Sequence, residues 1–217
     1  MTVHTATTPT LPDLTASELA DGLRRRSFSC REVMQSALHR IHALNPVFNA
    51  IVNMAPDEKL LAEADAADAE LANGLHGIPM VVKDFADVVG FPTTKGCELL
   101  ASHMPTSDSI MTARMKAAGC IVIGKTTTPE FGLGSHTFST LWGVTRNAWD
   151  PAVSAGGSSG GAAVSPWRSA CSPLPTARTE WVRCGTPPGG PRVRDAPFPG
   201  EGAPGRHVGR LDRPPVE

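Results

Sequence analysis

The chain has 217 residues, 41% of them hydrophobic, and a formal net charge of −1 at pH 7. This length suffices for one domain with its own core, and a charge so near zero argues against nucleic acid as a direct partner. No apolar run is as long as a membrane span, and the N-terminus lacks a basic region followed by an apolar one. We therefore expect a cytoplasmic protein without membrane association.

Composition changes abruptly after residue 164. The segment 165–217 holds eleven of the twenty prolines and eight arginines but no lysine or isoleucine. Such sequence buries too little apolar surface to offset the entropy lost on ordering. We predict that residues 1–164 fold and that residues 165–217 are a disordered tail.

Three helices are predicted in the first part of the chain. Thr15 with Glu18, and Ser29 with Glu32, fit the capping box that opens a helix. The first helix should end near Arg25, and the second should stop before Pro46. The second carries its apolar residues on one face: Val33, Ala37, Leu38, Ile41 and Leu44. A third helix is expected from about Asp57 to Ala72, ending at Asn73-Gly74.

After Gly77 the pattern becomes strand, helix, strand. The runs IPMVVKDF and CIVIGK are short and apolar, as buried strands are. Between them, SDSIMTARMKAAG predicts an amphipathic helix with Asp108 or Ser109 near its cap and Gly119 at its end. This order predicts an α/β fold with at least partly parallel strand pairing.

The five cysteines form no CxxC pair and no zinc-binding spacing, so we expect no metal site. Cys30, Cys97 and Cys120 are interpreted as small buried hydrophobic residues.

Lys83 ends the first apolar strand and is followed by Asp84. Taken alone, it is best interpreted as a surface lysine paired with Asp84. A lysine at the mouth of a buried strand can instead be desolvated, which lowers its pKa and lets it act as a neutral base.

The segment GKTTTPEFGLGS, residues 124–135, contains the Gly-Lys-Thr of a phosphate loop, and Gly119 has the required spacing. The intervening CIVI is a strand rather than a loop, so we favour a structural turn or a loop lining a site.

Residues 156–161 read Gly-Gly-Ser-Ser-Gly-Gly. Composition alone favours a flexible linker. A packed active-site loop also needs glycine, because it allows positive φ angles and close approach of the backbone. The flanking TRNAWDP and AAV are not linker sequence, which favours the second interpretation.

Together, four motifs resemble the amidase signature family: GIPMVVKD (77–84), GKTTTPEF (124–131), NAWD (147–150) and GGSSGG. Their order and spacing match, and the resemblance covers about residues 12–164. It implies an α/β fold with a mixed sheet flanked by helices, of which this chain holds the N-terminal part. It also implies an amide hydrolase that needs no metal or organic cofactor and takes a small-molecule amide substrate.

The resemblance assigns a Ser-Ser-Lys triad. The family's lysine falls on Lys83 as base, and its bridging serine falls on Ser158 as relay. Gly156, Gly157 and Gly160 are expected to shape the substrate loop, and backbone amides of a Gly-rich turn would stabilise the oxyanion. The resulting acyl-enzyme is hydrolysed by water or captured by an amine.

The family's nucleophilic serine belongs about two dozen residues further on, in a D-x-G-G-S-[IL]-R-x-P-A motif. Here Trp181, Val182 and Arg183 occupy that position. The codons of Pro175 to Pro188 can also be read in the shifted frame in which each triplet starts at the third base of a codon. In that frame the compulsory bases are compatible with the sequence Asp-Gly-Thr-Asp-Gly-(Met/Val)-Gly-Ser-(Leu/Val/Met)-Arg-Asn-Pro-Ala. Our hypothesis is a frameshift, real or a sequencing artefact, near Val164 or Ser165, which would leave this chain inactive.

Two other functions stay open. The same motifs occur in the amidase subunit of a tRNA-dependent amidotransferase, which works with partner subunits. Alternatively, the chain is a non-catalytic fragment of low stability, with unpaired strands and uncovered apolar faces. The sequence identifies no particular amide substrate, and a homo-oligomer is compatible with it.

Overall fold

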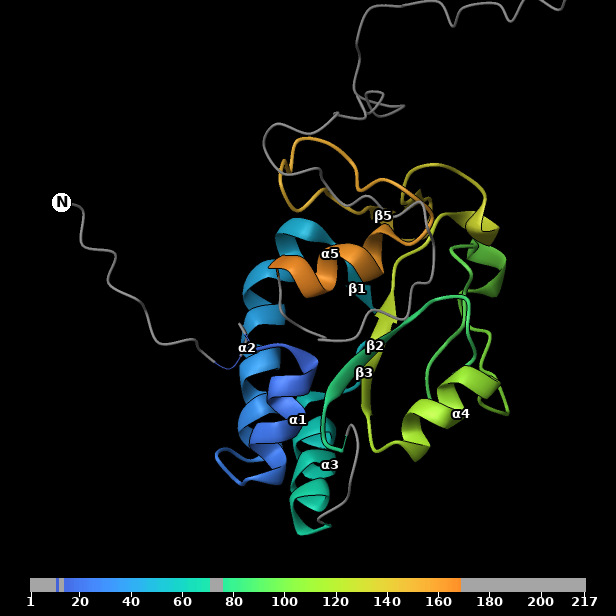
Figure 1. The fold of residues 1–217 in the computed structure, drawn as a ribbon. Helices are drawn as coiled ribbons and strands as arrows, with labels where there is room; N and C mark the ends of the chain where they lie inside the picture. The colour runs from blue at the N-terminus through green and yellow to red at the C-terminus, as the bar shows by residue number, and fades with distance from the viewer. Residues whose placement is uncertain (1–10, 12–13, 71–75, 169–217) are drawn as a thin grey trace, which may run out of the picture.

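A three-stranded mixed sheet lies among the helices (Figure 1). The structure, a computed structural model, describes residue 11 and residues 14–70 and 76–168. Strand β3 (Ile121–Thr126) is central: β2 (Pro79–Lys83) pairs with it in parallel and β1 (Ile51–Val52) pairs antiparallel. This confirms the predicted α/β class and the mixed sheet. In Figure 1, helices α1 to α3 lie to the left of the strands and α4 to the right.

Helices α1 (Ala16–Arg24) and α2 (Cys30–Phe48) begin where the capping boxes predict. The hydroxyls of Thr15 and Ser29 each accept a bond from the backbone of the glutamate three residues on, and that glutamate bonds back. Both predicted starts are confirmed.

The predicted end of α2 before Pro46 is wrong, because the helix continues through Phe48. The amide of Asn49 donates to the carbonyl of Asn45 at 2.7 Å, which closes the last turn around the proline. The Asn45 side chain then accepts from the amides of Ala50 and Ile51, both at 2.9 Å.

Two further helices differ from the predictions at their ends. Helix α3 (Asp57–Ala69) is shorter than expected, and Asn73-Gly74 lies outside the described residues. Helix α4 (Ile110–Ala117) has Ser109 as its N-cap, one of the two predicted residues, and Gly119 follows it with φ +90°. The side chains of Ile110 and Met111 are exposed, so the predicted amphipathic pattern fails in the first turn of α4.

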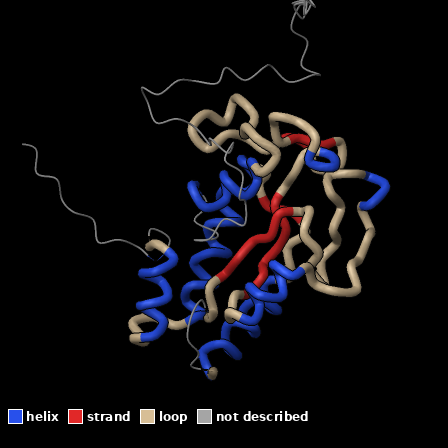
Figure 2. The backbone as a smooth tube through the Cα atoms, turned by 45° about the vertical axis from the view of Figure 1, so that its right-hand side comes forward, coloured by secondary structure: helices blue, strands red, loops and turns tan. Residues whose placement is uncertain are grey.

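The remaining elements follow β3. A short hairpin joins β4 (Phe138–Ser139) to β5 (Gly143–Val144), and α5 (Gly160–Arg168) packs against all three strands of the sheet. The segment between β3 and α5 consists mostly of long loops (Figure 2). The predicted disordered tail was 165–217, but its first four residues, 165–168, belong to α5. The rest of the predicted tail, 169–217, lies outside the described residues.

The core lies between α2, α3 and the sheet. Its fully buried members include Met34, Ile41, Leu60, Val81 and Ile123. In the described ranges, no helix combines the length and apolarity needed to cross a bilayer.

Candidate active site

Lys83 and the Gly-Ser loop meet at the carboxyl end of β2. The Nζ of Lys83 donates to Oγ of Ser158 at 3.3 Å and to Oγ of Ser159 at 2.9 Å. The structure thus brings together two residues that the sequence singled out, Lys83 and Ser158. It adds Ser159, which sequence reasoning did not select.

The sheet and a tight turn fix the direction of Lys83. Its Cα lies opposite Thr126 in the parallel β2–β3 register, and the amide of Asp84 extends the ladder to the Thr126 carbonyl at 3.0 Å. The chain then turns sharply, because the amides of Phe85 and Ala86 both donate to the Lys83 carbonyl. Lys83 therefore stands at the last position of a buried strand, with α5 and its loop above it.

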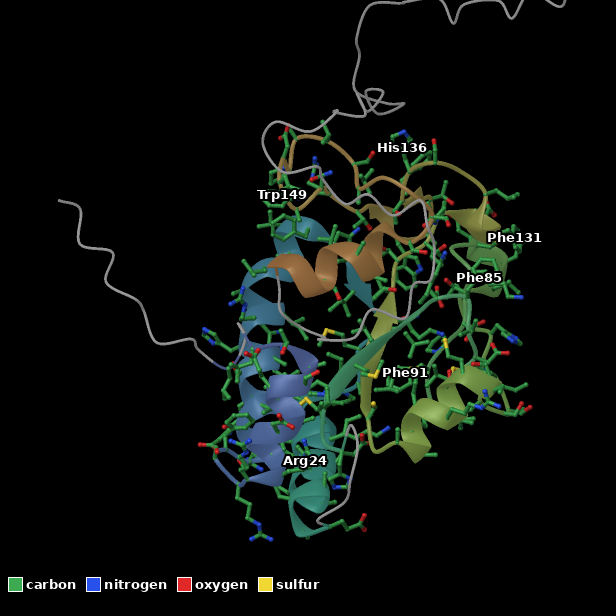
Figure 3. All side chains as sticks on the ribbon, viewed as in Figure 1. Arg24, Phe85, Phe91, Phe131, His136 and Trp149 are labelled. Carbon is green, nitrogen blue, oxygen red and sulfur yellow. The ribbon has the colours of Figure 1, made fainter. Side chains whose placement is uncertain are left out.

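Burial lowers the pKa of Lys83 below the usual lysine value of 10.5. The Phe85 ring, labelled in Figure 3, lies 5.6 Å from Nζ, and such a ring favours the charged amine. The net change in this pKa is downward, with burial as its cause, so the neutral amine forms at a lower pH than it does in an exposed lysine. This is the state that a general base requires.

The two serines differ in exposure. Ser159 is 1% exposed, whereas Ser158 is only partly buried. A hydroxyl that must exchange a proton with another group needs access to it. Partial exposure is compatible with such access at Ser158, whereas Ser159 is enclosed by protein.

The Gly-Ser loop (residues 156–161) is packed against neighbouring segments. The active-site interpretation predicts such packing, whereas a flexible linker would lack it. Thr137 donates from Oγ1 to the Gly157 carbonyl at 2.6 Å and accepts from the Gly160 amide at 2.8 Å. Thr128 donates to the Ser158 carbonyl at 3.2 Å. Nδ1 of His136 lies 2.9 Å from Oγ of Ser154, which ties the start of the loop to the preceding segment (Figure 3).

The glycines of the loop serve different purposes. Among Gly156, Gly157, Gly160 and Gly161, Gly157 alone has a positive φ, +78°. A Cβ on Gly160 would lie 2.5 Å from Oγ1 of Thr137, and one on Gly161 would lie 2.3 Å from Oγ1 of Thr127. Close approach is thus what requires glycine at 160 and 161, while a Cβ at Gly156 would meet open space. The amides of Gly157 and Gly160 donate within the protein, to Ser135 and Thr137.

The segment 124–135 is no phosphate loop. Gly124, Lys125 and Thr126 belong to β3, and the Lys125 side chain is completely buried. Thr128 contacts the Gly-Ser loop, as a segment lining the site would. The structure confirms the rejection of the phosphate-loop interpretation.

Asp84 pairs with Lys125, Nζ to Oδ1 at 3.6 Å, and both side chains are fully buried. The sequence alone had favoured an exposed pair of Asp84 with Lys83, and that interpretation is wrong. Side chains alternate along a strand, so Asp84 lies on the face opposite to Lys83. Lys125 lies opposite Val82 in the register and shares the face of Asp84. This alternation was the signal that could have identified the pair.

Metal ligands do not cluster in the described ranges, where no three His, Cys, Asp or Glu side chains gather. Cys30, Cys97 and Cys120 are free and buried, as predicted. Burial and the neighbouring Asp68 raise the pKa of Cys30 to about 12, and burial raises that of Cys120 to about 11.

Comparison with known proteins identifies the family. The model of the Amidase family matches residues 32–165. The chain belongs to the amidase signature family. A curated relative from Thiobacillus denitrificans, a subunit of its glutamyl-tRNA(Gln) amidotransferase, is 42% identical over 157 residues. That match covers 70% of this chain and 32% of the relative.

Solved structures of this amidase family agree. A bacterial aryl acylamidase of the amidase signature family superposes with a TM-score of 0.66 at 30% identity, covering 70% of this chain and 33% of that one. A 6-aminohexanoate cyclic dimer hydrolase superposes with a TM-score of 0.67 at 30% identity, covering 76% and 33%. This amidase chain therefore spans about a third of the length of the relatives it matches.

Proposed function

We propose that this chain supplies the Lys-Ser part of an amidase site that breaks a carboxamide C–N bond, with Lys83 as base and Ser158 as relay. The observation that carries the proposal is the contact of the Lys83 amine with the hydroxyls of Ser158 and Ser159 at a packed glycine loop. Desolvation of Lys83 supports the same assignment, because a base must be neutral to accept a proton. The substrate class is a small-molecule amide, and the proposal needs no metal or organic cofactor.

In the proposed reaction, a second serine attacks the amide carbonyl. Its hydroxyl proton passes to Ser158, and Ser158 passes its own proton to neutral Lys83. A hydroxyl can donate and accept at once, which suits Ser158 to this step. The new Ser O–C bond forms as a tetrahedral intermediate. When the C–N bond breaks, the proton held by Lys83 returns through Ser158 to the leaving amine. Water then hydrolyses the acyl-enzyme.

Ser159 and the threonines have supporting roles in this proposal. Ser159 is buried and nearer to Nζ, so it holds the lysine in place, while the partly buried Ser158 would exchange a proton with the second serine. Thr128 and Thr137 hold the carbonyls of Ser158 and Gly157. Gly156, Gly157 and Gly160 shape the loop.

Whether this chain can hydrolyse an amide by itself depends on the nucleophilic serine. The position that the family gives to its nucleophilic serine falls on Trp181 to Arg183, outside the described residues. We infer that the chain as it stands turns over no amide. A frameshift near Val164 or Ser165 would account for this.

Two measurements test the proposal. First, the coding DNA is translated in its other two forward frames from codon 164, and one frame should continue into an Asp-Gly-Thr-Asp-like segment. Second, the frame-restored protein is assayed on small aliphatic and aryl amides beside its Lys83→Ala and Ser158→Ala variants. Each variant should lose about 10²- to 10⁴-fold in rate, the usual contribution of a general base. Full activity in Lys83→Ala would overturn the assignment. Ser-dependent hydrolysis by the unaltered 217-residue chain would overturn its inferred inactivity.

A second candidate is the amidase subunit of a tRNA-dependent amidotransferase. The name of the curated relative, a subunit of glutamyl-tRNA(Gln) amidotransferase, favours it. The frame-restored protein would then transfer ammonia to an aminoacyl-tRNA only when partner subunits are added. Amide hydrolysis that is unaffected by partners would instead favour the simple amidase. The remaining alternative, a non-catalytic fragment of low stability, concerns the 217-residue chain itself, and assaying that purified chain on generic amides tests it.

A further inference from the structure

Lys125 is a cation enclosed by protein. Its side chain has no exposed surface, and its Nζ donates to the carbonyl of Ala86 at 2.7 Å and to Oγ1 of Thr93 at 3.0 Å. The carboxylate of Asp84, also fully buried, lies 3.6 Å away. The proposed reaction uses neither charge.

Asp84 is held equally firmly. It accepts from the amide of Thr94 at 2.9 Å and from the Thr94 hydroxyl. The same hydroxyl accepts from Nε1 of Trp142 at 3.0 Å and from the amide of Gly96 at 3.1 Å. The pair thus joins the end of β2, the loop at 93–96, strand β3 and the hairpin segment that carries Trp142.

These contacts converge on the turn that follows Lys83. Residues 84–86 fold back so that the Phe85 and Ala86 amides donate to the Lys83 carbonyl. The Asp84 side chain anchors the start of this turn, and Lys125 binds the carbonyl at its end, Ala86. Both anchors lie on the sheet face opposite to the Lys83 side chain.

Stability alone does not explain this arrangement. Two charges removed from water contribute little net free energy, and well-packed apolar residues often replace a buried pair without loss. A buried ion pair differs from an apolar pair because its ionic hydrogen bonds hold particular backbone groups in a fixed orientation.

We propose that Lys125 and Asp84 are positioning residues: the buried pair clamps the turn 84–86 from behind and so holds the Lys83 amine against the hydroxyls of Ser158 and Ser159. This inference rests on the proposed function, since it concerns the base of that site. Without the clamp, the turn relaxes and Lys83 moves towards water.

The test measures the state of Lys83 in the full 217-residue chain, without relying on catalysis. The protein is labelled with trace acetic anhydride over a range of pH, and mass spectrometry gives the pH midpoint of acetylation for Lys83. In the unaltered chain the midpoint should lie below 10.5, the ordinary lysine value. In Lys125→Met it should rise towards 10.5, which lowers the neutral fraction of Lys83 near pH 8.

Lys116→Met is the matched control. Lys116 is also paired with an aspartate, Asp108 at 2.9 Å, but it belongs to α4, which leads into the opposite end of β3. This variant should leave the Lys83 midpoint unchanged. Equal shifts in Lys116→Met and Lys125→Met would overturn the proposal, because the effect would then be general.

Loss of Lys125 alone leaves a buried carboxylate and can unfold the chain. The double variant Asp84→Asn/Lys125→Met removes both charges and serves as the second arm, with circular dichroism confirming its fold. It also loses the donor to Ala86, so its Lys83 midpoint should rise as well. An unchanged midpoint in either folded variant overturns the clamp alone. An ordinary midpoint in the unaltered chain overturns both the clamp and the proposed base.

Discussion

The amine of Lys83 lies closer to the buried hydroxyl of Ser159, at 2.9 Å, than to the accessible hydroxyl of Ser158, at 3.3 Å. The motif places two serines side by side, and the structure gives them different surroundings. One can hold the lysine while the other remains available for proton exchange. Substitutions should therefore separate the two.

Ser159→Ala should destabilise the folded chain more than Ser158→Ala. The first change removes the nearer acceptor from a partly buried amine and should cost about 1 to 3 kcal/mol in the free energy of unfolding. In the second, water can replace the lost hydroxyl, so we expect a cost below about 1 kcal/mol. Urea unfolding of both variants at pH 7.5 measures the difference. A greater loss in Ser158→Ala would show that Ser158 is the structural residue.

Stability should depend on pH through Lys83. Burial lowers its pKa in the folded state below 10.5, so the unfolded chain binds more protons between the two values. The contribution of Lys83 to stability is therefore fully present above pH 10.5 and is lost as the pH falls through the folded-state pKa. The free energy of unfolding of the unaltered chain minus that of Lys83→Met should grow from pH 7.5 to 10.5.

Taking this difference cancels other groups that titrate in the same range. Cys30 and Cys120, with pKa values of about 12 and about 11, act in the opposite direction. Because their thiol pKa values are raised in the folded state, their contribution to stability is present at lower pH and is lost as the pH rises through those values. They are present in both proteins. A difference that shrinks with rising pH would contradict a buried, desolvated Lys83.

Gly161→Ala should disrupt the loop, and Gly156→Ala should not. A Cβ at 161 would lie 2.3 Å from Oγ1 of Thr127 and 2.6 Å from its amide nitrogen, so α5 would have to move off β3. Such overpacking costs about 1 to 3 kcal/mol or more. At Gly156 no atom lies within 4 Å of the added carbon, so the change should stay within about 0.5 kcal/mol. Thermal unfolding of the two variants measures both effects.

The buried thiols should resist alkylation. Cys30, Cys97 and Cys120 are enclosed, and raised pKa values keep Cys30 and Cys120 protonated at pH 8. Iodoacetamide should leave all three unmodified in the native chain and modify them in 8 M urea, as peptide mass spectrometry would show. Rapid native labelling of Cys30 would mean that the contact between α2 and α3 opens readily.

Local signals predicted much of this structure. Thr15 and Ser29 mark helix starts because capping is a contact between neighbours in the chain. The apolar runs ending at Lys83 and Thr126 predict buried strands for the same reason. The end of α2 was missed because Asn45 holds the chain after Pro46 through contacts that composition does not reveal.

The site was predicted less completely, because it depends on contacts between distant segments. The motifs selected Lys83 and Ser158 but could not show that Ser159 lies nearer to the amine. They also could not show that Asp84 turns away from Lys83 to meet Lys125, since this depends on the register of β2 and β3. Gly161 was overlooked because its requirement arises from Thr127, a residue that follows another strand.

The separation of Lys83 and Ser159 along the chain also has a consequence for biosynthesis. The two residues are 76 positions apart, and ribosomes add about 5 to 20 residues each second. Lys83 therefore leaves the ribosome roughly 4 to 15 seconds before its hydroxyl partners. During that interval β2 can already pair with β3, but α5 and the serine hydroxyls that contact the amine have not yet been made. The contacts of Nζ with Ser158 and Ser159 can form only after α5 and its loop have been made, so the surroundings of this amine are completed late in the synthesis of the described residues.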